Sequence, residues 1–394
     1  MPSSFVLGNP HQSETTESLR DGALVFRSRR GLHPIARLAI EALPKQLAGD
    51  VLTGFSAEPA VALAVCASFP DVRVRHFELD LYVAARARAV LAQNDVSSVE
   101  VVAAADLPGV RYPGDRADAV FEGTPCAAVI LPFPARGDAK LARDLVEQAA
   151  LVLAPGAPLY AVTDHPDGEW VKELLRDVFG RADAVLRTKY DGVVFVARRG
   201  DKRVRAKDRT HDVVVEHGGG SLAFASRPGT FTYGRLDGGT RALLASHALA
   251  ALPPRDGDVV LDLGAGIGIL GVAVAKARRA ARAILVESNV RATDLARANA
   301  ARCDVRADVV AAPDAVALQD GCATLALTNP PYFANFRIAE QFVADAFRCL
   351  APGGTLLLVA KEKTNHAAIV TRHFGRVDVE DVGDYGVFVA TRSP

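Results

Sequence analysis

The sequence predicts an α/β fold in which two similar domains follow one another, each built on a mostly parallel sheet. Three observations support this prediction. From residue 257 onward, apolar runs alternate with helical segments, as expected for parallel strands that helices cover on both faces. A chain of 394 residues is long for a single hydrophobic core. Segments of the second half also recur in the first half, in the same order.

The elements of the second half can be assigned in order along the chain. Two β-rich runs around the glycines at 218–220 predict a hairpin. Residues 377–392 predict an antiparallel hairpin that turns at Gly383 and Asp384, and Asn289 is expected to cap a helix. Between these hairpins the pattern predicts strands at 258–263, 283–287, 324–331 and 354–360, and helices at 269–280, 290–303 and 338–350.

The recurring segments indicate an internal duplication. LAPGAPLYAV at 153–162 resembles LAPGGTLLLV at 350–359. The other two pairs are FGRADA with FGRVDV and YDGVVFVARR with DYGVFVATR. Coincidence among segments rich in Ala, Val and Gly is the alternative, but the shared order favours two copies of one α/β unit.

Charge and composition divide the chain and exclude several classes. The run RRGDKRVRAKDRTH at 198–211 is strongly basic and predicts an exposed linker, so the expected parts are residues 20–199, a linker at 200–212, and residues 213–394. Lys and Arg together number 46, as do Asp and Glu, so any nucleic-acid surface must be local. Five scattered cysteines without CxxC spacing favour a reducing cytoplasm and no metal site. Neither a signal peptide nor a membrane span is expected.

A glycine-rich loop after the strand at 258–263 carries the first chemical signal. Gly264, Gly266 and Gly268 let the backbone approach a ligand where a helix begins. Glu287 ends the next strand, 21 residues after Gly266, where an acid can accept both hydroxyls of a ribose. The loop also satisfies the dinucleotide fingerprint, and a purely structural turn is a further alternative. Asp262, two residues before the first glycine, favours an adenosine cofactor other than a nicotinamide dinucleotide.

The second signal is Asn329-Pro330-Pro331-Tyr332, directly after an apolar strand. Proline cannot donate to a sheet ladder and restricts φ, so the strand must end here in a stiff backbone. Asn329 is then held at a strand end beside an aromatic ring. Such an arrangement suits a site that binds a planar chemical group.

Together these motifs resemble the signature of class I, Rossmann-fold S-adenosylmethionine-dependent methyltransferases that act on planar amino groups. The segment RPGTFTYGRLDGGTRALL at 227–244 resembles the corresponding segment of the ribosomal RNA guanine-N2 methyltransferases. That family also carries a degenerate copy of its catalytic domain in its N-terminal half. The family usually reads Asn-Pro-Pro-Phe-His, whereas this chain has Tyr332 and Phe333. Glutamine-N5 and adenine-N6 methyltransferases share the form Asn-Pro-Pro-Tyr.

The resemblance implies S-adenosylmethionine as cofactor. Asp262 and the glycine loop would hold its methionine end, Glu287 the ribose, and Asp314 the adenine amino group. Thr240 and Asp237 would line the entrance. The alternatives are that Asp314 caps a helix and that Thr240 and Asp237 only hold a turn.

The resemblance also implies methyl transfer to guanine N2 in ribosomal RNA, with the small subunit favoured. The carbonyl groups of Asn329 and Pro330 would accept the two N–H bonds of the amine, and Tyr332 would stack on the base. The partner would be ribosomal RNA or a ribosomal subunit, and the protein a cytoplasmic monomer. The alternatives are a protein-glutamine or adenine methyltransferase, an NAD-dependent dehydrogenase, and a non-catalytic RNA-binding assembly module.

The first half is expected to fold like the second but to bind no cofactor. An offset of 209 residues aligns the two loops, and an offset of 197 aligns the two strand ends. The aligned pairs are Thr53 with Asp262, Phe55 with Gly264, Ala57 with Gly266, Pro59 with Gly268, Glu78 with Glu287, and Pro132 with Asn329. We expect Phe55 and Pro59 to obstruct the pocket of this copy.

Overall fold

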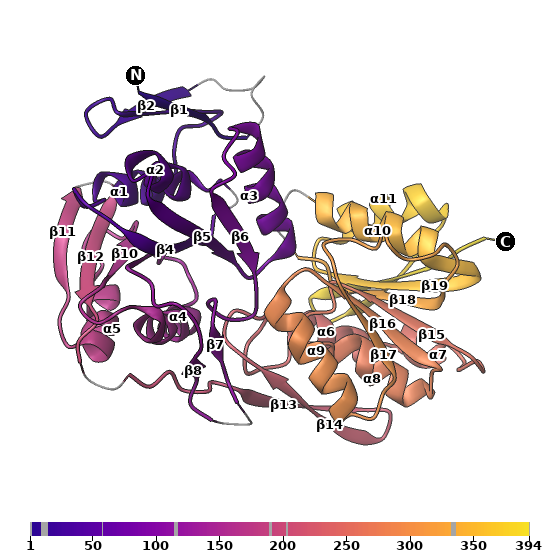
Figure 1. Ribbon diagram of the computed structural model, residues 1–394. Helices are drawn as coiled ribbons and strands as arrows, with labels where there is room; N and C mark the ends of the chain where they lie inside the picture. Colours follow the sequence, from indigo (N-terminus) through magenta and orange to yellow (C-terminus); the bar gives the residue numbers. More distant parts are fainter. Residues whose placement is uncertain are drawn as a thin grey trace. The chain divides into compact units, whose positions relative to one another are not determined.

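The computed structural model describes residues 2–8, 15–56, 58–113, 117–188, 191–201, 204–331 and 336–393. The chain forms two compact units, Met1–Arg209 and Thr210–Pro394. Each unit has its own sheet and its own hydrophobic core (Figure 1). No helix in the described ranges is long and apolar enough to cross a membrane.

The second unit is built on a seven-stranded sheet in the order β17-β16-β15-β18-β19-β21-β20 (Figure 1). The first five of these strands are parallel, and β21 runs antiparallel to both of its neighbours. The predicted α/β class, with an antiparallel hairpin at the end, is therefore confirmed. The strands are β15 Val259–Leu263, β16 Arg282–Glu287, β17 Ala307–Ala311, β18 Ala323–Thr328, β19 Leu350–Ala360, β20 Asp378–Val382 and β21 Tyr385–Thr391.

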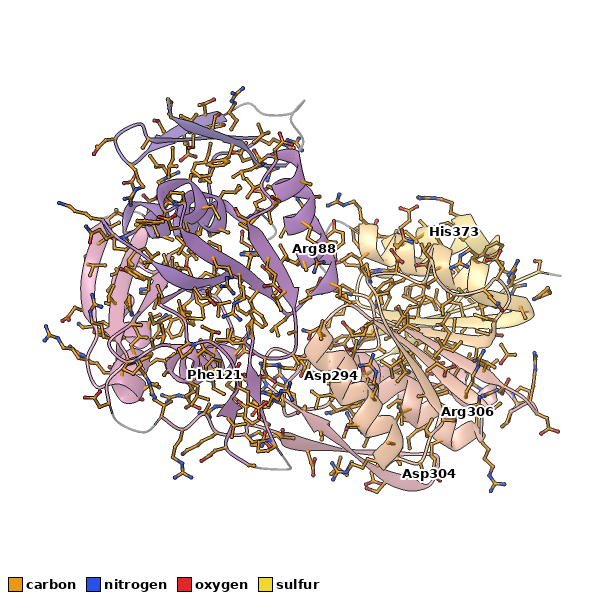
Figure 2. The ribbon with its side chains drawn as sticks, viewed as in Figure 1. Arg88, Phe121, Asp294, Asp304, Arg306 and His373 are labelled. Carbon is orange, nitrogen blue, oxygen red and sulfur yellow. The ribbon has the colours of Figure 1, made fainter. Side chains whose placement is uncertain are left out.

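Helices cover both faces of this sheet because alternate strand residues are apolar on both sides. Val260 of β15 packs in the cluster with α8, whereas Leu261 and Leu263 pack in the cluster with α10. Some exposed ion pairs link neighbouring elements; Lys276 of α8 contacts Asp304, which lies in the turn after α9 (Figure 2). The helices are α6 Gly238–Leu244, α7 His247–Ala251, α8 Ile269–Arg278, α9 Val290–Arg302, α10 Arg337–Cys349 and α11 Lys363–Phe374.

The first unit repeats this topology. Its sheet has the order β11-β12-β10-β9-β4-β5-β6, in which β4, β5, β6, β9 and β10 are parallel. The strands are β4 Gly49–Gly54, β5 Val72–Glu78, β6 Val99–Ala103, β9 Ala128–Pro132, β10 Pro158–Thr163, β11 Asp183–Thr188 and β12 Gly192–Arg198. The helices are α1 Pro34–Glu41, α2 Ala60–Ser68, α3 Leu81–Gln93, α4 Ala139–Val152 and α5 Glu169–Phe179.

Strand registers match between the two sheets residue by residue. Gly54 lies opposite Phe77, as Leu263 lies opposite Val286, which is the offset of 209. The offset of 197 holds for β9 and β18: Thr53 pairs with Ile130, and Asp262 pairs with Leu327. The internal duplication inferred from sequence is therefore present in the fold.

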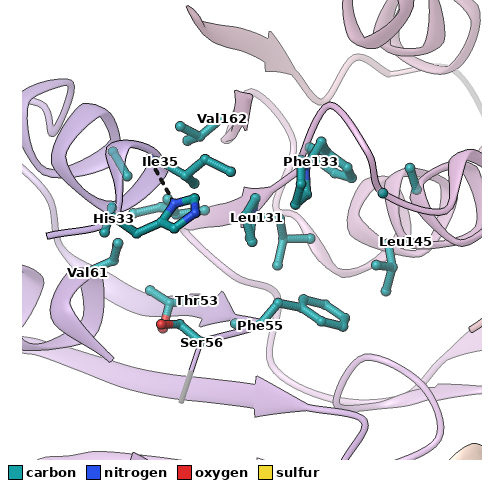
Figure 3. A pocket seen from close by; sticks show the side chains of 18 of the residues that line it. His33, Ile35, Thr53, Phe55, Ser56, Val61, Leu131, Phe133, Leu145 and Val162 are labelled. Atoms are coloured by element: carbon teal, nitrogen blue, oxygen red, sulfur yellow. Dashed lines mark hydrogen bonds between the residues drawn. The ribbon is translucent and has the colours of Figure 1, made fainter. Parts of the chain in front are cut away.

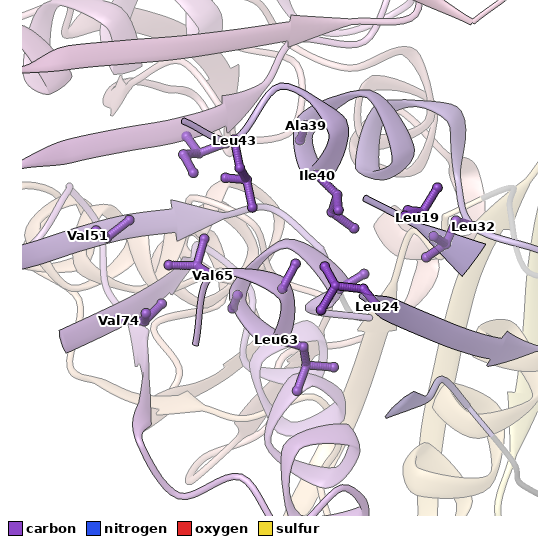
Figure 4. Packing of buried hydrophobic residues seen from close by; sticks show 14 of the residues in the cluster. Leu19, Leu24, Leu32, Ala39, Ile40, Leu43, Val51, Leu63, Val65 and Val74 are labelled. Atoms are coloured by element: carbon purple, nitrogen blue, oxygen red, sulfur yellow. The ribbon is translucent and has the colours of Figure 1, made fainter. Parts of the chain in front are cut away.

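The first unit also contains an additional layer that the sequence did not predict. A three-stranded sheet in the order β1-β3-β2 packs on α1 and α2. Leu24 of β3, Ile40 of α1 and Leu63 of α2 share one buried cluster (Figure 4). The three strands are β1 Ser3–Val6, β2 Thr15–Leu19 and β3 Leu24–Ser28.

The basic segment between the domains is partly packed rather than freely exposed. Ala206 is buried, and its carbonyl accepts a hydrogen bond from the Ala119 N–H at 2.8 Å. Arg205 pairs with Asp118 at 2.6 Å, and Arg209 pairs with Glu147. Because these acids lie in the first unit, residues 204–209 belong structurally to that unit.

Candidate active site

The loop between β15 and α8 depends on its glycines. Gly264, Gly266 and Gly268 have φ values of 70°, 56° and 88°, the left-handed region that favours glycine. The N–H groups of Gly264 and Ala265 both donate to the Val286 carbonyl at 3.0 Å, which bends the loop over the end of β16. A Cβ on Gly264 would also lie 2.8 Å from the Phe342 ring. Replacing these glycines with residues that carry side chains would therefore deform the loop.

Asp262 lies buried beneath the loop. One of its carboxylate oxygens accepts a hydrogen bond from the Gly271 N–H at 2.7 Å. Burial raises the pKa of Asp262 to about 7; the Gly271 hydrogen bond lowers this pKa, and the Glu287 charge adds to the rise. Within the described ranges no Lys, Arg or His forms an ion pair with Asp262. The site therefore favours a positively charged ligand group beside this carboxylate.

Glu287, at the carboxyl end of β16, connects the loop to the next helix. One carboxylate oxygen accepts a hydrogen bond from the Gly266 N–H at 2.7 Å, and the other accepts one from the Asn289 N–H at 2.8 Å. Asn289 in turn caps α9 through the Ala292 N–H, as predicted. The carboxylate is thereby held in one orientation at the sheet edge.

Asn329 follows β18 and is oriented by α6. Its side-chain N–H₂ group donates to the Asp237 carboxylate at 2.7 Å and to the Thr240 hydroxyl at 3.3 Å. Asp237 is itself fixed, because it caps α6 and accepts from the Gly239 and Thr240 N–H groups at 2.8 and 3.0 Å. A carboxylate only accepts hydrogen bonds, so the amide cannot be flipped. The Asn329 carbonyl oxygen is left as an acceptor.

The structure gathers about half of the expected site residues around one small pocket, whose lining does not include Glu287. Its lining includes Asp237, Thr240, Asp262, Gly264, Gly266 and Asn329. Gly268 lies at the start of α8, outside the lining, and Pro330 is buried beside partly buried Pro331. Tyr332, like Phe333, lies outside the described residues.

Asp314 is not part of this lining. Its carboxylate accepts a hydrogen bond from the Val316 N–H at 3.1 Å in the turn after β17. No helix begins at this point, so the alternative that Asp314 caps a helix is wrong.

Two functional features were missed by sequence reasoning. Phe231 and Thr232 line the pocket from the loop before α6, and the Phe231 ring is 57% exposed. This loop is anchored on α9, because Arg291 donates to the Pro228 carbonyl at 2.5 Å and Asn289 donates to the Gly229 carbonyl at 2.9 Å. An exposed phenylalanine in the segment 227–244 was the available signal.

The second missed feature is Asn299, which is fully buried on α9. Its amide donates to the Ile267 carbonyl of the glycine loop at 2.9 Å. It also pairs with both backbone groups of Ala225, at 2.7 and 3.0 Å, in the hairpin β13 His211–His217 and β14 Gly220–Ser226. One side chain thus joins the helix, the loop and the hairpin.

The strand order, the glycine loop and the acid at the end of β16 together form a Rossmann-type cofactor-binding site. Residues 221–388 match the family model described as "Methyltransferase small domain". This match lies within the second unit, and the predicted resemblance to the ribosomal RNA methyltransferases is confirmed by similar proteins.

Two relatives and one solved structure describe this similarity. "Ribosomal RNA small subunit methyltransferase C" from Pseudomonas aeruginosa (strain LESB58) is 32% identical over 179 residues, 44% of this chain and 52% of the relative. The protein of that name from Pseudomonas syringae pv. tomato is 28% identical over 306 residues, 73% of this chain and 90% of the relative. The T. thermophilus 16S rRNA N2 methyltransferase RsmC, solved with AdoMet and guanosine, has a TM-score of 0.73 at 21% identity.

These matches differ in extent. The T. thermophilus structure aligns with 97% of this chain and with 99% of its own length, which shows that the whole two-unit fold is shared. The chain spans about half the length of the first curated relatives that it matches.

Proposed function

We propose that the protein transfers a methyl group from S-adenosylmethionine to the exocyclic N2 amine of a guanine in ribosomal RNA, with small-subunit RNA favoured. The orientation of Asn329 carries this proposal. Asp237 engages the amide N–H₂ group, so the carbonyl oxygen is the group that meets the substrate. An amino group on a flat ring donates N–H bonds and fits that acceptor. The names of the similar proteins support the same reaction.

The residues of the site fit the cofactor. Asp262 is a buried carboxylate that pairs with no cation among the described residues, which suits the ammonium of the methionine end. A Cβ on Gly266 would meet no atom within 4 Å, so space lies open over the loop. Glu287 is held at the strand end, where it can accept ribose hydroxyls. When bound, S-adenosylmethionine supplies the electrophilic methyl group.

Positioning is the main catalytic task of the protein. The lone pair of the guanine N2 amine is delocalised into the ring, so this nitrogen is a poor nucleophile. The carbonyl groups of Asn329 and Pro330 accept its two N–H bonds, which directs the lone pair toward the methyl group. A methylated ammonium loses its proton readily, so no strong base is needed. Tyr332 follows this pair and is proposed to stack on the base.

The proposal extends to partners and domain roles. The substrate is ribosomal RNA, free or in a ribosomal subunit, and the protein acts as a cytoplasmic monomer. Residues 213–394 form the catalytic part, and residues 20–199 form a degenerate copy that binds no cofactor. Asp314 remains a candidate for the adenine amino group, although it does not line the pocket.

Product analysis tests the proposal. Purified protein is incubated with S-adenosylmethionine and either small-subunit RNA or assembled small subunits, and the RNA is digested to nucleosides for mass spectrometry. We expect N2-methylguanosine. N6-methyladenosine, or a methylated glutamine in a ribosomal protein, would instead support the alternatives that share Asn-Pro-Pro-Tyr. Binding of NAD without binding of S-adenosylmethionine would contradict the methyltransferase proposal altogether.

A further inference from the structure

The first unit contains a cavity of about 540 Å³, although we expected Phe55 and Pro59 to obstruct it. Both residues form part of its wall. The cavity lies at the carboxyl ends of the parallel strands, where α/β sheets bind ligands. Thr53 and Phe55 line it at the positions that Asp262 and Gly264 occupy in the second unit (Figure 3).

The buried polar groups of this cavity satisfy one another. The Thr53 hydroxyl lies 2.9 Å from His76 Nδ1, and His76 Nε2 lies 3.0 Å from the Ser56 carbonyl and 3.1 Å from Glu78. Glu78 also accepts a hydrogen bond from the Ser56 N–H at 2.5 Å. Thr53 replaces the carboxylate that would meet an ammonium. Glu78 is only 3% exposed and does not line the cavity, whereas the matching Glu287 is partly exposed. The floor therefore offers little to a methionine or a ribose.

Apart from exposed His33, whose Nδ1 accepts a hydrogen bond from the Ile35 N–H at 3.3 Å, and the charged rim, the remaining wall is mostly apolar and aromatic. Phe55 lines the cavity together with buried Leu131 and Phe133 (Figure 3). Trp170 also belongs to the lining. The Phe55 ring is held by an edge contact with Phe77, with ring centroids 5.4 Å apart. A wall of this kind favours a flat ring system, which gains stacking energy without needing buried polar partners.

Cations lie at the rim. Arg86 of α3 lines the cavity and is exposed, and Arg136 is exposed in the loop that contributes Pro134 and Gly137 to the lining. No acid pairs with either arginine in the described part of the chain. Of the two acids at the rim, Asp138 already accepts two N–H groups as the cap of α4. Glu58 is the other. An anionic backbone can therefore contact the arginines while its ring enters the cavity.

We propose that this cavity receives one unpaired base of an RNA strand by stacking, while Arg86 and Arg136 contact the adjacent phosphates. The RNA partner rests on the proposed function. Because the floor has no free polar group to read base edges, the cavity accepts any base and favours purines for their larger ring area. The degenerate copy thus replaces a cofactor site with a docking site for a single base.

Trp170 provides a direct test, because it is the only tryptophan of the chain. Its fluorescence is followed while full-length protein is titrated with a single-stranded oligoadenylate, with GMP or with S-adenosylmethionine. We expect quenching by both oligoadenylate and GMP, tighter binding of the oligonucleotide, and much weaker binding of S-adenosylmethionine, which has an adenine ring but no phosphate for the arginines. Unchanged emission with saturating oligoadenylate, or quenching by S-adenosylmethionine at concentrations as low as those of oligoadenylate, would overturn the proposal.

Variants locate the signal. Ala36 and Leu141 are partly exposed lining residues, so Ala36→Phe and Leu141→Phe fill the cavity from two different helices. We expect each to weaken the fluorescence-detected affinity for oligoadenylate about tenfold, within the range for one stacked base. Ala85→Phe adds the same ring on exposed α3 outside the lining and should leave the affinity unchanged. Wild-type affinity in both filling variants, with melting temperatures preserved, would show that the base binds elsewhere.

The two proposals can fail separately. Methyl transfer by the wild-type protein is read from the nucleoside product, whereas occupancy of the cavity is read from Trp170. Quenching that the filling variants abolish, without any N2-methylguanosine, would refute the proposed reaction and keep the docking site. Normal methylation with no quenching of Trp170 would keep the proposed reaction and refute the docking site.

Discussion

Asn329 obtains its orientation from a residue 92 positions earlier in the chain. Asp237 and Thr240 hold the amide N–H₂ group, so the carbonyl oxygen points to the acceptor side of the pocket. Both residues were expected only to line an entrance or to hold a turn. In the proposed reaction this contact gives them a positioning role, because they would determine which end of the amide meets the substrate.

Replacing Asn329 tests this arrangement. Asn329→Ala removes the acceptor but leaves the glycine loop intact, so methyl transfer should fall about 10²- to 10³-fold while cofactor affinity is retained. Rates under saturating RNA and calorimetric titration of the cofactor provide the two readouts. Asn365→Ala, on exposed α11, is the matched control and should behave as wild type. Wild-type turnover by Asn329→Ala would rule out the proposed role.

Asp262 should make stability depend on pH in a defined direction. Its folded-state pKa of about 7 lies above the unfolded value, so the folded chain holds a proton that the unfolded chain releases. The resulting stabilisation is complete below about pH 4 and is lost as the pH rises toward 7. The variant Asp262→Asn keeps an acceptor for the Gly271 N–H but has no titrating group, so its stability does not fall with pH for this reason.

The free energy of unfolding of Asp262→Asn should therefore rise relative to wild type, by about 1.4 kcal/mol per pH unit between pH 5 and 7, and level off above pH 8. Denaturant unfolding at several pH values in the absence of cofactor measures this difference. Asp304→Asn is the control, since the Asp304 side chain is 97% exposed. A difference that stays constant with pH would show that Asp262 titrates normally.

At the level of elements, Asn299 connects three parts that sequence patterns treat separately. The hairpin of β13 and β14, helix α9 and the glycine loop each use one of its hydrogen bonds. The loop geometry thus depends on a hairpin that contributes no side chain to the pocket lining. A cofactor site that looked local in sequence is supported by a helix some 30 residues further on.

Asn299→Ala should lower the free energy of unfolding by about 2–4 kcal/mol, because it leaves buried backbone groups without partners. It should also weaken cofactor binding, since the Ile267 carbonyl loses its anchor. Chemical denaturation and calorimetry measure both effects. Arg302→Ala breaks the exposed pair with Asp212 between the same helix and hairpin, and should cost at most about 1 kcal/mol. Equal losses in the two variants would contradict the role of Asn299.

At the scale of the whole molecule, one cofactor is expected per chain. The second unit keeps the glycines and Asp262, whereas the first has Phe55 and Thr53 at the matching places. Calorimetric titration of full-length protein with S-adenosylmethionine should give a stoichiometry of one. Residues 210–394 alone have their own sheet and core, so this fragment should retain cofactor affinity but lose most RNA affinity. Two sites per chain, or full RNA activity of the fragment, would contradict this division of roles.

Much of the fold follows from local patterns in the sequence. Continuous apolar runs such as β18 and helices α8, α9 and α10 were expected because periodicity is a local property, whereas β17 and α11 were not. The small elements were not: α6 and α7 span seven and five residues, and β1 to β3 are short and partly polar. Their positions depend on packing against other elements, which local propensity does not encode.

Of the site, too, one part could be predicted from local sequence patterns and another part could not. The sequence by itself determined the glycine loop, Glu287 and Asn329, since these occur at strand ends with characteristic spacing. Only the tertiary structure decided which way the Asn329 amide faces, that Asn299 holds the loop, and that the first unit keeps a cavity despite Phe55. The physical reason is that hydrogen-bond direction and empty volume arise between residues distant in the chain, and no spacing rule records them.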